Sequence, residues 1–155
     1  MEKIPCMVRI DSAFAEEGKR YPGTFESSEE RIRVAWTQEE EEKGEGESRF
    51  LLSYRIKDKT LHMSRKGSAE TDMVFRAGSK TEGIMRTSHG DFDLSMETFD
   101  LAFFPEEEDR EEEEEGQIYL VKKAVLKYHL CFPQQEPMLN NMIFEVRLAK
   151  KEKNV

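Results

Sequence analysis

The sequence is poor in the residues that build disulfide frameworks and membrane spans. Its 155 residues include two cysteines, Cys6 and Cys131, and neither lies in a C-x-x-C pair. Small secreted domains usually carry more cysteines, so we expect both thiols to be reduced, with one disulfide between an early and a late strand as the open alternative. No run approaches the roughly 20 apolar residues of a membrane helix, and the N-terminal stretch MEKIPCMVRI lacks the apolar core of a signal peptide. These absences favour a cytoplasmic protein without a membrane span.

Motifs that carry chemistry are also missing. The three histidines, His62, His89 and His129, fall on different predicted elements, with no H-x-x-x-H, H-E-x-x-H or Cys/His cluster. Zinc sites and nucleophilic catalysis both need such groups close together. The glycines are isolated in turns and form no phosphate-binding loop. We therefore expect no metal, no cofactor and no catalytic residue, and we interpret the protein as a non-enzyme.

Acidic residues are abundant but concentrated in two runs. Residues 38–47 (QEEEEKGEGE) carry a net charge of −5, and residues 105–116 (PEEEDREEEEEG) carry −8. Subtracting these −13 charges from the formal −9 leaves +4 for the rest of the chain. Such runs bury little apolar surface, so we expect two flexible acidic loops on a mildly basic single domain spanning residues 1–155. Neither run has the ligand spacing of a calcium loop.

The most regular stretch, residues 60–98, alternates apolar and polar side chains between short turns, which is typical of β-strands. The same period of two is found at residues 6–10, 32–36, 50–56, 118–132 and 142–148. A second short strand is expected at residues 21–26, where Pro22 and Gly23 indicate an edge position or a bend. For residues 119–128 a helix is the alternative, and a strand of this length is expected to bend or to contain a bulge.

About ten short strands with short connections and almost no helical pattern favour antiparallel neighbours. An open sheet of this size would expose its edges, whereas closure removes them. We therefore predict an all-β fold, a single up-and-down antiparallel β-barrel of about 8–10 strands. The interior of such a barrel is filled or nearly filled by side chains, leaving at most a small ligand cavity.

Several short motifs resemble one family. Arg65-x-Gly67, Met73-x-Phe75-x-x-Gly78, Thr87-x-x-Gly90 and a closing Thr98 follow one another, preceded by Ile32-Arg33-Val34-Ala35-Trp36. In this order they resemble the YwiB-like family of uncharacterised bacterial proteins, over roughly residues 8–148. The resemblance implies a calycin (lipocalin-like) barrel and carries no established function. Two features depart from the family pattern: Met85 replaces a usual tyrosine, and both acidic runs are longer.

One side chain stands out in this pattern. Arg65 shares parity with Leu61 and Met63, so the alternation points its charge inward, where it needs partners. It would either close one end of the barrel, bonding carbonyls or a carboxylate and stacking on an aromatic such as Trp36 or Tyr128, or anchor the carboxylate or phosphate head of a ligand. A third alternative is that the strand ends earlier and Arg65 is exposed. The candidate ligand-binding set consists of Arg65, Met63, Phe75, Thr87, Thr98, Trp36 and Tyr128.

Three functions compete. The first is binding of a small amphipathic or lipid-like ligand inside the barrel, with inward methionines either as its lining or as ordinary core filler. The second is a non-catalytic interaction or structural module, including a homodimer. The third, an enzyme, needs a polar cluster in a cleft that these residues do not supply. Nucleic-acid binding is disfavoured because no basic stripe interleaves with aromatic residues.

Overall fold

The computed structural model describes residues 2–12, 18–39 and 46–150, which form eleven β-strands and one short 3-10 helix. No helix in these residues is long and apolar enough to cross a membrane. The elements in chain order are β1 (Ile4–Asp11), β2 (Arg20–Ser27), β3 (Arg31–Glu39), β4 (Glu47–Arg55), β5 (Thr60–Lys66), β6 (Glu70–Arg76), β7 (Lys80–Thr87), β8 (Gly90–Phe103), η1 (Glu106–Glu108), β9 (Arg110–Glu114), β10 (Gln117–Cys131) and β11 (Met138–Ala149).

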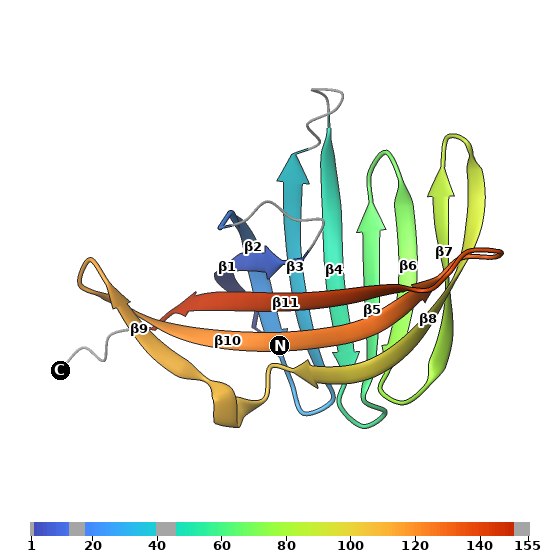
Figure 1. The fold of residues 1–155 in the computed structure, drawn as a ribbon. Helices are drawn as coiled ribbons and strands as arrows, with labels where there is room; N and C mark the ends of the chain where they lie inside the picture. Colours follow the sequence, from blue (N-terminus) through green and yellow to red (C-terminus); the bar gives the residue numbers. More distant parts are fainter. Residues whose placement is uncertain (1, 13–17, 40–45, 151–155) are drawn as a thin grey trace.

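Ten of the strands form a closed antiparallel barrel. Strands β1 to β8 pair in chain order, β8 pairs with β10, β10 with β11, and β11 returns to β1. Strands β3 to β7 stand upright at the back of Figure 1, while β10 and β11 cross in front of them. Closure satisfies the hydrogen-bonding edges that an open sheet would expose. The prediction of an up-and-down barrel of 8–10 strands is confirmed.

The barrel interior is an apolar core built by strand alternation. Inward side chains from nine of the ten barrel strands meet in a single cluster of buried residues, and β7 adds the half-buried Met85 against it. Aromatic rings run through it: Phe75 lies 4.7 Å from Tyr128, and Trp36 lies 6.2 Å from Phe144, measured between ring centroids. These contacts fill the middle of the barrel with side chains, as expected for this strand number.

The long segment from Gln117 to Cys131 is a strand throughout, so the helix alternative for residues 119–128 is wrong. Its pairing with β8 shifts between Lys127 and Tyr128. The shift leaves Phe99 without a partner, so the extra residue lies in β8 and not in the long strand where a bend or bulge was expected.

The second acidic run is a correction to the sequence interpretation. Residues 105–116 are not a loop: they form η1 and β9, and β9 pairs with Gln117–Val121 of β10. Glu115 and Gly116, with φ values of 51° and 81°, make the two-residue turn between these strands. Of the first run, residues 38, 39 and 47 lie in β3 and β4, and residues 40–45 lie outside the described part of the chain.

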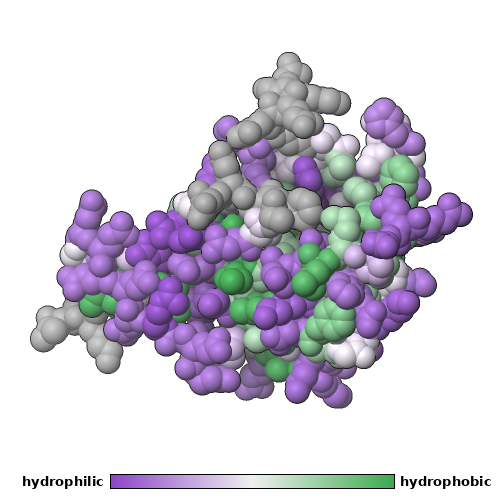
Figure 2. Space-filling model, in the orientation of Figure 1, coloured by the Kyte–Doolittle hydropathy of each residue, from purple (hydrophilic) through white to green (hydrophobic). Residues whose placement is uncertain are grey.

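Basic side chains of the barrel hold β9 in place. Arg147 on β11 contacts Glu114 at 2.5 Å and Glu112 at 3.3 Å, and its guanidinium lies over the ring of Tyr119. Hydrophilic residues accordingly cover most of this end of the molecule in Figure 2. Further ion pairs join Arg110 to Glu112 and Glu145, Lys122 to Asp109, and Lys150 to Glu111. The sequence suggested that this acidic run is solvated. In the structure its carboxylates instead pair with basic side chains, most of which are distant in sequence.

Strand β2 is not an edge strand, which was one of the two alternatives that Pro22 and Gly23 indicated. It lies between β1 and β3, and Pro22 is opposite Met7 while Gly23 is opposite Trp36. A Cβ atom at Gly23 would overlap the carbonyl oxygen of Ala35. The glycine is therefore required by the close approach of β2 and β3.

The two cysteines are free thiols in different environments: Cys6 is buried on β1 and Cys131 is half-exposed at the end of β10. Burial raises the pKa of the Cys6 thiol from its ordinary 9.0 to about 11. Only the thiolate is nucleophilic, so a rise of this size lowers the reactive fraction near pH 8 by about 100-fold.

We expect a disulfide-exchange reagent at pH 8 to titrate one thiol rapidly and the second only on unfolding. Peptide mapping should place the fast label on Cys131, and Cys131→Ser should remove the fast phase alone. Equal rates for the two thiols in the folded protein would contradict the burial of Cys6. Since the folded-state pKa is the higher one, the contribution of Cys6 to stability is present below pH 9 and is lost as pH rises through about 11.

Candidate ligand site at one end of the barrel

Arg65 points into the barrel, as the alternation predicts. It lies near the end of β5, opposite Phe50 on β4 and Thr71 on β6. Its guanidinium carbon is 5.5 Å from the centroid of the Phe50 ring, and Nη2 donates a long hydrogen bond of 3.4 Å to the hydroxyl of Ser48. Among the described residues no carboxylate pairs with it. The charge is therefore stacked on an aromatic ring and, within the described part of the chain, is not paired with an opposite charge.

The aromatic partner differs from the two that the sequence suggested. Arg65 stacks on Phe50, and the Phe50 ring stacks in turn on Trp36, with centroids 5.2 Å apart and planes 4° from parallel. Tyr128 lies elsewhere, against Phe75. Phe50 and Ser48 were missed, although both share the inward parity of Leu52, so the β4 alternation was the signal that could have identified them.

Two buried N–H donors at this end have no hydrogen-bond partner within the described residues. They are Nε of Arg65 and Nε1 of Trp36. Buried donors are usually paired, and an unpaired one costs about 1 to 3 kcal/mol. Phe50 lies between the two residues in the strand register. The two unpaired donors therefore lie on opposite sides of the Phe50 ring, and both are buried away from solvent.

The inner face becomes progressively more exposed along the row that contains Arg65. The row runs across five hydrogen-bonded strand pairs and consists of Trp36, Phe50, Arg65, Thr71, Met85 and Phe92. Trp36 is only 4% exposed, Phe50 to Met85 are half-buried, and Phe92 is 45% exposed. An inward-facing strip of Thr71, Met85 and Phe92 therefore continues from the arginine towards solvent.

The other predicted site residues do not gather at this strip. Phe75 and Tyr128 belong to the packed core, and Met63 packs half-buried against that core. The Tyr128 hydroxyl lies 3.9 Å from the sulfur of Met142, and burial raises its pKa although a hydrogen bond with Asn140 lowers it. These residues are therefore part of the packed interior of the barrel.

Two predicted threonines have structural roles. The Thr98 backbone carbonyl accepts from Gly78 N–H at 2.8 Å, and its N–H donates to Ser79 at 3.2 Å, which ties β8 to the turn between β6 and β7. Its buried hydroxyl has no partner in the described residues. Thr87 caps the β7–β8 turn, because its hydroxyl accepts from His89 N–H and donates to Gly90.

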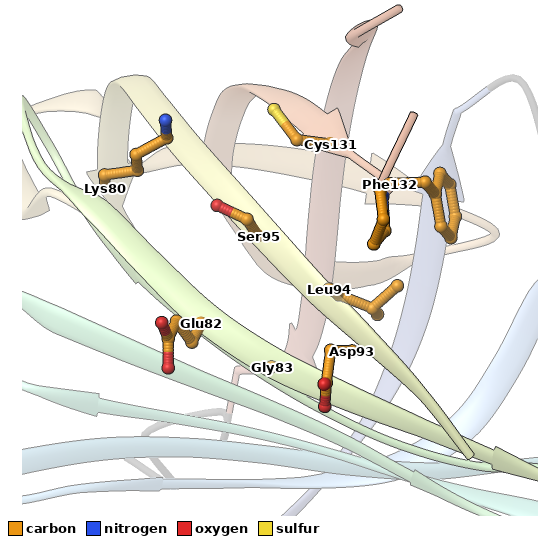
Figure 3. A pocket seen from close by; sticks show the side chains of 9 residues that line it. Lys80, Glu82, Gly83, Asp93, Leu94, Ser95, Cys131 and Phe132 are labelled. Carbon is orange, nitrogen blue, oxygen red and sulfur yellow. The ribbon is translucent and has the colours of Figure 1, made fainter. Parts of the chain in front are cut away.

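A separate recess of about 420 Å³ opens beside the end of β10. Figure 3 shows its side chains coming from β7, β8 and the β10 end, with the Cys131 sulfur apart from the carboxylates of Glu82 and Asp93. No histidine lines it.

His62 lies exposed, as parity predicted, 3.8 Å from Asp72. His89 lies exposed in a turn, and His129 packs on Phe99. No group of three or more histidine, cysteine or acidic side chains in the described part of the chain could hold a metal ion.

The protein is therefore a closed ten-strand antiparallel β-barrel with a half-buried arginine at one end of its interior. The model of a family described as a domain of unknown function (DUF1934) matches residues 19–142. The chain belongs to this family. No curated protein matches it. The crystal structure of the ywiB protein from Bacillus subtilis is similar, with a TM-score of 0.66 and 13% sequence identity over 96% of this chain and 94% of the other. The predicted YwiB-like family and fold are confirmed.

Proposed function

We propose that this protein is a non-catalytic barrel that binds a small amphipathic ligand with an anionic head group. Arg65 would hold the head group and the half-buried inner strip towards Met85 and Phe92 would contact the apolar part. The observation that carries the proposal is the Arg65 guanidinium, which lies half-buried inside the barrel without a carboxylate partner among the described residues.

An anion is the expected head group because the arginine fork matches carboxylate and phosphate oxygens. A ligand oxygen would bond to the Nη groups of the guanidinium, because Nε is buried away from solvent. The strip beyond it is apolar and partly open at Met85 and Phe92. Methionine side chains adapt their shape, which suits a lining that accepts a flexible chain.

The test is calorimetric titration of dodecanoate into the purified protein, with 1-dodecanol as the neutral probe. We expect dodecanoate to bind more tightly than the alcohol, and Arg65→Met to weaken dodecanoate by about tenfold or more, the value of a charge-assisted hydrogen bond. Stability should change by less than about 1 kcal/mol because the variant keeps the apolar stem and loses no ion pair.

Arg86→Met is the matched control. Arg86 lies on β7 one residue from Met85, but its side chain is exposed and pairs with Glu70 at 3.9 Å. This variant should bind dodecanoate like the parent. A large drop in the melting temperature of Arg65→Met with unchanged affinity would show that Arg65 is a structural residue and would remove the proposal.

A protein-interaction role is the second candidate. It is favoured by an apolar patch on the outer face, where Phe99 is 50% and Leu139 is 60% exposed. Both flank His129, which pairs with Leu139 across β10 and β11 and packs on Phe99 at 4.6 Å. Self-association in sedimentation velocity, abolished by a polar side chain at Leu139, would support a homodimer.

A further inference from the structure

A second cavity opens at the end of the barrel opposite Arg65. It has a volume of about 580 Å³, within the range of small-molecule sites. It lies between the β2–β3 turn, the β4–β5 turn and η1, which meet at the lower end of Figure 1. Arg65 is near the far end of β5, so the two sites are separate.

Aromatic rings form one wall of this cavity. Tyr54 and Phe103 are stacked, with centroids 4.8 Å apart and planes at 24°, and both line the cavity. Phe103 continues into the core through Phe104 at 4.6 Å. Ile32 and Ile56 add apolar surface. The wall is therefore flat, apolar and backed by the packed interior, which suits the ring or apolar body of a small molecule.

Carboxylates occupy the rim. Glu29 and Glu106 line the cavity, and none of the described residues that line it is a lysine, arginine or histidine. In the part of the chain that the structure describes, neither glutamate has an ion-pair partner. Glu107 and Glu108 extend the acidic turn beyond the rim. Two carboxylates without an ion-pair partner in the described residues thus lie beside aromatic faces.

The rim is built on anchored turns. The Ser28 hydroxyl accepts from the N–H groups of Glu30 and Arg31, which fixes the β2–β3 turn that carries Glu29. The other glutamate is fixed by Asp109, whose N–H donates to the Glu106 carbonyl at 3.1 Å and whose carboxylate pairs with Lys122 at 2.6 Å. Hydrogen bonds and an ion pair thus hold the backbone that carries both glutamates.

We infer that this cavity binds an organic monocation with an aromatic or apolar body, the ring lying on Tyr54 and Phe103 and the ammonium group facing Glu29 and Glu106. Aromatic faces and carboxylates both attract cations, and an anion would be repelled here. This site goes beyond the anionic ligand proposed at Arg65 and does not depend on it.

The experiment uses three probes that share one ring system: 2-naphthylmethylammonium, 2-naphthylmethanol and 2-naphthoate. Binding to the full chain is followed by naphthalene fluorescence anisotropy. We expect the ammonium to bind at least about threefold more tightly than the alcohol, and added salt to reduce this preference. Glu29→Gln with Glu106→Gln should abolish the preference for the ammonium while leaving the alcohol unchanged.

Glu107→Gln is the matched control, because it removes the same charge from the same turn without lining the cavity. It should keep the preference. Arg65→Met should leave ammonium binding intact and affect dodecanoate only, which separates the two proposals. Equal binding of ammonium and alcohol, tighter binding of naphthoate, no saturable binding of any probe, or an unchanged preference in the double variant would each overturn the inference.

Discussion

Phe75→Ala is expected to lower the free energy of unfolding by about 3 to 5 kcal/mol, the usual cost of removing a buried phenylalanine ring. Phe75 is among the largest fully buried side chains and packs against Tyr128 at 4.7 Å. Removing the ring deletes these contacts and leaves a cavity that the surrounding strands fill only in part. Because domains are stabilised by about 5 to 15 kcal/mol in total, the variant should retain only part of its stability.

Urea denaturation followed by tryptophan fluorescence measures this change, since the sole tryptophan, Trp36, is in the core. Val74→Ala is the control: it is the neighbouring residue on the opposite face of β6 and is half-buried, so we expect a loss below about 1.5 kcal/mol. The comparison also tests a prediction from the sequence. If Phe75 were mainly a ligand contact, its replacement would reduce the affinity for the ligand. The urea midpoint of Phe75→Ala would then stay near that of Val74→Ala.

Gly23→Ala is expected to cost about 2 to 3 kcal/mol, because overpacking at a close backbone approach forces strands apart. A Cβ atom there would overlap the Ala35 carbonyl oxygen and lie 3.1 Å from Trp36 Cβ. The obstacle is backbone, so no side-chain rotation relieves it. The β2–β3 pairing must open or shift, and it lies next to the Trp36–Phe50 stack.

Thermal unfolding monitored by circular dichroism checks this expectation. Thr24→Ala, one residue away on the other face of β2, should unfold close to the parent. The two faces of the same strand are thereby compared at nearly the same point in the barrel. A Gly23→Ala protein as stable as Thr24→Ala would mean that β2 and β3 are less closely apposed than described.

Much of the barrel could be predicted from the alternation of apolar and polar side chains. Period-two patterns located the barrel strands, their inward faces and the inward direction of Arg65. The turn glycines of the YwiB-like motifs are explained by the fold: Gly78 and Gly90 have φ values of 74° and 126° in the turns on either side of β7. Short-range rules suffice for such features, because strand faces and turns depend on neighbouring residues.

Strand β9 shows where local reasoning failed. Its five residues are one arginine and four glutamates, a composition that is typical of a solvated segment. The two-residue Glu115–Gly116 turn before a clear strand was the available signal for a hairpin. What stabilises the pairing is Arg147 on β11, more than thirty residues away in sequence. No local pattern contains that contact.

By itself the sequence determined the all-β class, the faces of the strands and the membership of the YwiB-like group. Only the tertiary structure decided what each inward side chain meets: Phe50 rather than Trp36 or Tyr128 beside Arg65, cations beside the acidic run, and carboxylates beside the Tyr54–Phe103 stack. The physical reason is that alternation specifies the face on which a side chain lies. Its partners depend on strand register and on how the barrel closes, and these are properties of the whole chain.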